Sequence, residues 1–561
     1  MSPSDPHLEK LVDDLRGQRI DRRRFLQRAA ALGLSLPAAS ALLAACGGGE
    51  SSEGTTSGTG TSGGPQQAGG GGTLNLHLDE DIENLDPGIQ PGHADTTVAS
   101  NVFEQLVAYK PGTFDTANTL AESWEGSNDG LRWQFRLKQG IPFHKDYGEV
   151  TADDVKFSFE RIAGLTKPKL DSPYSGDWGT LEGVQVNGKY EGVVVLKEPF
   201  APLMTTTVPV QSGSIVSKKA VEQMGAKKFG TSPVGTGPFE FVSWAPNQKV
   251  VLKRFEKYGG ANSDYVQAMP WDEIDFIVIG EDNPTTIALE SGQLDFAVLP
   301  TDAVSRFQGN DQFTVEKRTS LNYNWIGMNV LHESLKDKNV RLAVRYGVDV
   351  PSMIDAAFDG LYTQATAEVA PGMPVGYWKD APKYERDVEK AKGYLQQADA
   401  VGRELVFSVS SAEPGADKIA EIAQQNLEEV GFKINIEVQE SAQFDQATKA
   451  ADAQKQLFYT GFTTNPDPSW VTVWFTCAQV NVWNYMSWCN KEYSSLDQQA
   501  SRTNDQATRQ DMYERMQQEM DADVPAVWVA WPTIYFGAKQ GITPSIRPDG
   551  NTYYGFAFTQ A

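Results

Sequence analysis

Cysteine and histidine are both rare in this sequence. The 561 residues include 3 Cys and 5 His. The histidines are scattered, no HExxH motif occurs, and none lies near the two C-terminal cysteines, so a zinc hydrolase or a zinc-stapled domain is not favoured. We therefore expect no metal site and no other cofactor.

Nucleotide-binding and nucleophile motifs are also missing. The chain has neither a GxSxG nucleophile elbow nor a Walker A loop. A formal GxGxxG occurs at residues 58–63, but no strand pattern precedes it and no helix pattern follows it, so it does not predict a dinucleotide site. No enzyme class is favoured, and we expect a protein without catalytic activity.

Positive charge is scarce. There are 49 Lys and Arg against 73 Asp and Glu, which gives a formal net charge of −24. Such an acidic chain is not expected to bind nucleic acid. An apolar run of about 20 residues, which a transmembrane helix needs, is absent as well. The late run Val524–Ala538 is too short and contains Pro525 and Pro532, so we expect a buried strand that crosses between domains.

The N-terminus carries the basic residues that the rest lacks. Arginines lead into Ala29–Ala45, where no residue is charged and Pro37 interrupts the run. This pattern predicts a signal peptide over residues 1–45. Arg22–Leu26 resembles a twin-arginine signal, although Asp21 stands where that motif usually has Ser or Thr, so general secretion stays an alternative.

A lipid anchor is predicted directly after the signal. Residues 43–46 resemble a bacterial lipobox, in which the thiol of Cys46 takes a diacylglycerol; an ordinary signal peptide with a chance cysteine is the alternative. Residues 46–72 are almost wholly Gly, Ser, Thr, Gln and Glu, which is typical of a flexible tether. We expect an extracytoplasmic protein held at the outer face of the bacterial cytoplasmic membrane through Cys46.

The folded body shows α/β patterns. Alternation predicts a strand at Thr73–Leu78, and Thr151 can cap a following helix. Leu405–Val409 alternates, a helical stripe follows up to Gly431, and Ile434–Val438 alternates again. This order predicts a βαβ unit with a parallel pair of strands. A further strand and helix are expected at residues 322–329 and from residue 340 onward.

One window is rich in aromatic residues. Between Phe458 and Tyr493, ten of 36 residues are aromatic, against 10% of the whole chain. Such rings suit a ligand cleft, and filling a core is the alternative. The window also contains Cys477 and Cys489. Export favours a disulfide between them, with two unpaired thiols as the alternative.

Short motifs in a fixed order over nearly the whole body resemble one family. The most specific is Pro233–Phe239, PVGTGPF. The others are NLDP (84–87), VFEQLV (102–107), LAESWE (120–125), TADDVKFSFER (151–161), SGQLD (291–295) and VRLAV (340–344). On these motifs the chain resembles the substrate-binding lipoproteins of ABC importers, peptide/nickel-binding class (solute-binding protein family 5).

The resemblance implies an α/β fold of the periplasmic-binding-protein type II, with two hinged lobes, mixed sheets and an extra domain. The implied segments are lobe I, residues 73–108 with 235–316 and 531–561; an extra domain of lobe I, residues 109–234; and lobe II, residues 317–530. A monomer is expected to capture a peptide-like or other small polar or amphipathic solute between the lobes. It would deliver the solute to an ABC permease with cytoplasmic ATPases; a sensory receptor or a hydrolase on the same scaffold are the alternatives.

Thr464 stands at the position that bears on the class of ligand. In peptide binders of this family an Asp in a turn of the second lobe pairs with the peptide ammonium, and here Thr464 falls at that position. A sugar or an opine therefore stays open beside a peptide. The candidate binding residues are Thr464 and Asp467 for polar capture, Trp470, Trp474, Trp483 and Trp488 for stacking, and Tyr323 and Trp325 as weaker candidates.

Overall fold

The computed structural model describes residues 71–89, 92–258, 269–449 and 455–560. The predicted signal peptide, the lipid attachment at Cys46 and nearly all of the predicted tether lie outside these residues. Within the described part of the chain, no helix combines the length and the apolar character needed to cross a membrane.

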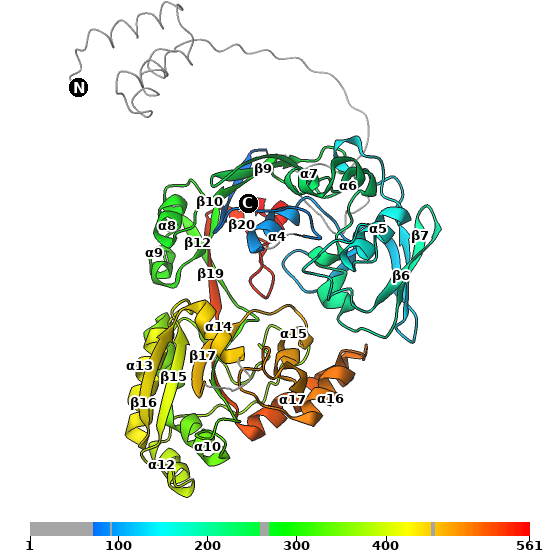
Figure 1. Cartoon of the computed structure of the whole chain (residues 1–561). Coiled ribbons are helices and arrows are strands. Elements are labelled where there is room, and N and C mark those ends of the chain that lie inside the picture. Colours follow the sequence, from blue (N-terminus) through cyan, green and yellow to red (C-terminus); the bar gives the residue numbers. More distant parts are fainter. Residues whose placement is uncertain (1–70, 90–91, 259–268, 450–454, 561) are drawn as a thin grey trace, which may run out of the picture. The chain divides into compact units, whose positions relative to one another are not determined.

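A mixed seven-stranded sheet is built from both ends of the folded body (Figure 1). Its order is β12 (Phe313–Thr319), β19 (Thr533–Lys539), β11 (Phe296–Leu299), β1 (Thr73–Leu78), β10 (Glu273–Val278), β9 (Lys249–Arg254) and β8 (Phe239–Ala245). β1 runs parallel to β10 and β11, and the other pairs are antiparallel. The strand predicted at Thr73–Leu78 is confirmed, and its three leucines point into the core. We call this sheet, with its helices α8 (Asp282–Glu290) and α9 (Val304–Phe307), lobe I.

A separate antiparallel sheet lies within residues 109–234. Its order is β4 (Ala121–Gly126), β5 (Arg132–Leu137), β7 (Glu191–Leu196) and β6 (Leu181–Gly188). Helix α5 (Ala152–Ile162) contacts β6 and begins with a capping box between Thr151 and Asp154. Val155 and Phe159 are fully buried on its inner face.

The second large sheet has six strands and forms what we call lobe II. Its order is β14 (Thr363–Gln364), β18 (Ala526–Trp531), β13 (Tyr323–Met328), β17 (Leu457–Phe462), β15 (Glu404–Ser410) and β16 (Lys433–Gln439). β15 and β16 are parallel and are joined by α13 (Ala416–Val430), so the predicted βαβ unit is confirmed. The helix ends at Gly431, whose φ of 114° favours glycine.

Other helices cover lobe II or lie at the ends of its strands (Figure 1). They are α10 (Lys338–Gly347), α11 (Val350–Phe358), α12 (Val388–Gln397), α14 (Ser441–Lys449), α15 (Ser469–Thr472), α16 (Lys491–Ala500) and α17 (Gln506–Asp523). The helix expected from residue 340 onward is α10, and the strand expected at residues 322–329 is β13.

Two chain connections join the sheets. β12 of lobe I leads into β13 of lobe II, and β18 of lobe II leads through Pro532 into β19 of lobe I. The late apolar run therefore crosses between the sheets as predicted, although it does so as two strands, β18 and β19, separated at Pro532, rather than as one. The backbone N–H of Ser320 donates to the carbonyl of Pro532 at 2.8 Å, which ties the two connections together. The domain boundaries stated above stay a prediction.

Candidate ligand site

A cavity of about 230 Å³ opens in lobe II next to the two connections. It is lined by Asn322, Tyr323, Asn324, Phe358, Tyr362, Glu413, Pro414, Gly461, Phe462, Thr463 and Pro532. A complete ligand pocket usually has roughly 300–1,000 Å³. The cavity therefore suits one part of a solute rather than a whole one.

Strand direction explains why these residues meet. β15 and β17 are parallel, so their carboxyl ends share one edge of the sheet. Glu413 follows the end of β15, and Phe462 and Thr463 stand at the end of β17. β13 is antiparallel to β17 and therefore begins at the same edge, at Tyr323. Loops at the carboxyl ends of parallel strands are the usual place for ligands in α/β sheets.

Glu413 is the charged residue of the cavity lining. The Asn324 side-chain amide donates to its Oε1 at 3.1 Å. Burial raises the pKa of Glu413, and a hydrogen bond from the backbone N–H of Gly461 opposes that rise. Among the described residues no Lys, Arg or His forms an ion pair with it, so its carboxylate faces the cavity without a counter-charge.

Asn324 brings a further oxygen to this edge. Asn324 is 7% exposed, and its Oδ1 has no hydrogen-bond partner in the described part of the chain. Buried polar atoms are nearly always hydrogen-bonded in native proteins. The unpaired Asn324 Oδ1, on a residue that lines the cavity, therefore indicates room for a donor.

Gly461 lets these groups come close to the sheet. A Cβ at this position would lie 2.2 Å from Asn324 Nδ2 and 3.1 Å from Glu413 Oε1. Any side chain would displace the amide, so the position requires glycine for close backbone approach.

Thr464 lies beside the cavity rather than in its wall. Its backbone N–H donates to Asn322 Oδ1 at 3.1 Å, and its hydroxyl donates to the Asn465 carbonyl at 3.3 Å. The neighbouring Thr463 does line the cavity. The turn predicted for polar capture thus reaches this edge, and capture by Thr464 itself stays a prediction.

Asp467 is fully buried in an ion pair with Arg509. Its two carboxylate oxygens accept from Arg509 Nη2 at 2.8 and 2.9 Å, and Oδ2 also accepts from the Thr205 hydroxyl at 2.7 Å. The expected role in polar capture would require this pair to open. Thr205 belongs to residues 109–234, so the contact links that segment with lobe II.

Three of the candidate tryptophans gather around Phe462, which lines the cavity. Trp474 and Trp483 contact Phe462 with ring centroids 6.5 and 6.2 Å away, and Trp470 contacts Trp474 at 6.2 Å. Trp483 is 38% exposed and lies under the ammonium of Lys449, 3.8 Å from its ring centroid. These rings extend an aromatic surface outward from the cavity, and ligand stacking on them stays a prediction.

The remaining candidate aromatics lie in the interior. Trp325 is fully buried, Trp488 is 3% exposed, and both belong to one hydrophobic cluster with Tyr323. Trp488 also donates from Nε1 to Asp523 Oδ2 at 2.9 Å. For Trp325 and Trp488 the structure favours the alternative of core packing. Tyr323 belongs to that cluster and also lines the cavity.

Cys477 and Cys489 form a disulfide. The bridge closes a loop that carries Trp483 and Trp488, so it restrains the segment that holds the aromatic surface. Pairing of these cysteines agrees with the interpretation from export.

Glu413, Asn324 and Tyr362 were not among the residues expected from sequence. A signal for Glu413 was present, because it lies in the loop between the first strand and the helix of the predicted βαβ unit, where ligand-binding loops occur. Asn324 was hidden, because its partner is 89 positions away in sequence.

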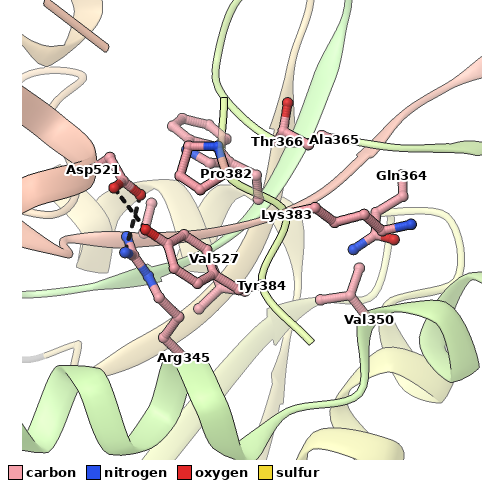
Figure 2. Close-up of a pocket in the computed structure, with 12 residues that line it drawn as sticks. Arg345, Val350, Gln364, Ala365, Thr366, Pro382, Lys383, Tyr384, Asp521 and Val527 are labelled. Carbon is pink, nitrogen blue, oxygen red and sulfur yellow. Dashed lines mark hydrogen bonds and ion pairs between the residues drawn. The ribbon is translucent and has the colours of Figure 1, made fainter. Parts of the chain in front are cut away.

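A second cavity in lobe II is too small for a solute. It has about 30 Å³ and lies between β18 and the segment around Tyr384 (Figure 2). Asp521 on its wall accepts from Arg345 at 3.0 Å and from the Tyr384 hydroxyl at 2.7 Å, as Figure 2 shows. Arg345 and Asp521 on its wall are thus paired with each other, and the space is about that of a water molecule. Elsewhere in the described residues, no group of three or more His, Cys, Asp or Glu could hold a metal ion.

Comparison with known proteins finds relatives and solved structures that cover most of the chain. The dipeptide-binding protein of Escherichia coli (strain K12) is 28% identical over 462 residues, covering 77% of this chain and 84% of its own length. The structure of HbpA2 from Haemophilus parasuis superposes with a TM-score of 0.79 at 26% identity, covering 87% of this chain and 100% of that one.

A third similar structure is an ABC transporter-associated periplasmic binding protein from Helicobacter pylori in complex with the peptide STSA. It has a TM-score of 0.70 and 24% identity, and covers 88% of this chain and 98% of that one. The expected type II periplasmic-binding fold is confirmed by these neighbours. Residues 116–482 match the family model described as bacterial extracellular solute-binding proteins, family 5 Middle. The chain belongs to this family of solute-binding proteins.

Proposed function

We propose that this protein is the lipid-anchored solute-binding subunit of an ABC importer and that it captures a peptide-like or other small amphipathic solute beside the lobe connections. The observation that carries the proposal is the cavity at the edge of lobe II, where Glu413, Asn324 and Phe462 meet. It combines a carboxylate, an amide and aromatic walls, which suits a solute with both polar and apolar parts.

Binding in this proposal is coupled to closure of the lobes. Contacts between residues 109–234 and lobe II already exist, because Thr205 donates to Asp467 and the Ala201 N–H donates to the Ser501 carbonyl at 2.8 Å. A solute shifts the equilibrium towards closure only by the contacts that it gains in the closed state. The permease then recognises the closed form as loaded.

The sequence of the N-terminal segment supports the proposed location outside the cytoplasmic membrane. The lipid on Cys46 keeps a monomer at the outer face of the cytoplasmic membrane, and the tether lets it search for its permease. Permease subunits and cytoplasmic ATPases are the partners of this proposal. A sensory role at a membrane receptor is the second candidate, since the same closure would serve both.

The solute class is proposed as peptide-like on the strength of the relatives. The E. coli relative is named as a dipeptide-binding protein, and the H. pylori neighbour holds a peptide. Thr464 keeps sugars and opines open, because a hydroxyl does not replace the charge of a carboxylate.

Native mass spectrometry of protein purified from its own host tests the proposal. We expect one solute of defined mass per chain, and small-angle scattering that shows compaction when that solute is added to emptied protein. Consumption of the solute into a product would contradict a transport role. Unchanged scattering at saturating solute would contradict closure.

A further inference from the structure

We propose that Glu413 and Asn324 form a subsite for a cationic group of the solute, an ammonium or a guanidinium, which takes over the task of the carboxylate that position 464 lacks. The inference deepens the proposed function and rests on it. The group would come from the N-terminus of a short peptide or from a basic side chain. Both sources have the same recognition chemistry, in which N–H donors meet carboxylate and amide oxygens.

The charge balance of the cavity supports a cation. Among the described residues that line it, Glu413 is the single charged one. Leaving a half-buried carboxylate without a counter-charge is unfavourable, because burial removes the water that stabilises the charge. A cation in the cavity would complete the pair.

The remaining polar atoms favour a donor as well. The Asn324 amide N–H donates to Glu413, and its buried Oδ1 has no hydrogen-bond partner among the residues that the structure describes. An ammonium has three N–H donors and no acceptor, so one group could satisfy both the carboxylate and Oδ1.

The aromatic walls fit the same ligand. Tyr362 and Phe462 line the cavity, and Tyr362 stacks on Phe358 with ring centroids 4.0 Å apart. The faces of such rings attract cations. A cavity of about 230 Å³ leaves space for the cationic end of the solute, with the rest of it towards the aromatic surface at Trp474 and Trp483.

Calorimetric titration of the full chain tests the subsite. The probes are trialanine, N-acetyl-trialanine and N-acetyl-Ala-Lys-Ala, and the variants are Glu413→Gln and Glu421→Gln. Glu421 is an exposed residue of α13, so its variant makes the same change in charge away from the cavity. Loss of a charge-assisted contact should weaken binding roughly 30-fold or more in Glu413→Gln and leave Glu421→Gln unchanged.

The peptides separate the two sources of the cation. Binding of trialanine but not of its acetylated form assigns the subsite to the N-terminal ammonium, whereas binding of the acetylated lysine peptide assigns it to a side chain. In both cases Glu413→Asp, which keeps the charge on a shorter side chain, should recover part of the lost affinity. This recovery and an unchanged urea midpoint distinguish recognition from misfolding.

Two results would overturn the inference. If the wild-type chain binds a peptide and Glu413→Gln binds it equally well, the subsite is wrong while the proposed function stands. If the wild-type chain binds none of the three peptides, the peptide class of the proposed function fails, and the subsite fails with it.

Discussion

Replacement of Asp467 by Asn separates a structural role from a ligand-binding one. Asp467 and Arg509 are both buried, with 0% and 1% of their side chains exposed. The substitution keeps the shape of the side chain but leaves the guanidinium without its counter-charge. Loss of one partner of a buried pair typically costs about 3–5 kcal/mol. We expect the free energy of unfolding of Asp467→Asn to fall by roughly that amount.

Urea unfolding followed by tryptophan fluorescence measures this loss. The control is Glu198→Gln, because Glu198 pairs with Arg502 across the same two segments, but both side chains are nearly half exposed. An exposed pair contributes about 0–1 kcal/mol, so the midpoint of the control should hardly move. A double variant of Asp467 and Arg509 should lose less than the sum of the single variants, because the two charges are coupled.

The opposite outcome is equally clear. If Asp467→Asn unfolds at the wild-type urea concentration but binds solute about 30-fold more weakly, the carboxylate faces the ligand, and the ion pair seen in the structure does not govern its role.

Further predictions concern the buried acid, the tryptophans and the disulfide. Glu368 is fully buried, and burial raises its pKa to about 8. Between the ordinary pKa of a glutamate and about pH 8, the folded state therefore keeps a proton on Glu368 that the unfolded chain loses. The free energy of unfolding falls as the pH rises through this range. Glu368→Gln should remove this loss of stability, which is on the order of a few kcal/mol. Urea midpoints of the wild type and of the variant at about pH 5 and pH 8 measure the loss. If the stability of both proteins changes equally between these pH values, the pKa of Glu368 is not raised by burial. Trp483→Ala should weaken solute binding by about 1–3 kcal/mol with little change in stability, whereas Trp488→Ala should destabilise the fold by about 3–5 kcal/mol. Calorimetry measures the loss of binding and urea unfolding measures the loss of stability. If the two variants behave alike in both assays, the assignment of Trp483 to the ligand and Trp488 to the core is wrong. Reduction of the bridge between Cys477 and Cys489 should cost about 3 kcal/mol of stability, measured by unfolding with and without reductant, and an unchanged midpoint would refute a stabilising loop closure.

The sequence was sufficient for the local architecture of lobe II. Alternation in Leu405–Val409 and Ile434–Val438, with a helical stripe between them, depends on contacts within some thirty residues and predicts the βαβ unit directly. The crossing run around Pro532 was likewise predictable, because its apolar length and its proline are local properties.

The site was harder to predict, because its chemistry depends on distant partners. Asp467 resembles a free polar group until Arg509, 42 positions later, is seen to neutralise it. Trp325 and Trp488 are of a residue type that is common in ligand clefts, but they are buried in the core. Sequence periodicity alone does not distinguish a core position from a cleft position. Glu413 stood at a place that topology favours, yet its unpaired charge becomes visible only when Asn324 is packed against it.

The hydrogen bond between Ser320 and Pro532 has a mechanical consequence. Two independent linkers would let the sheets slide, twist and separate, whereas two linkers fastened at one point restrict them to bending about that point. The two lobes would then close about one hinge axis during solute capture. A substitution in either linker should therefore change the closing motion as a whole.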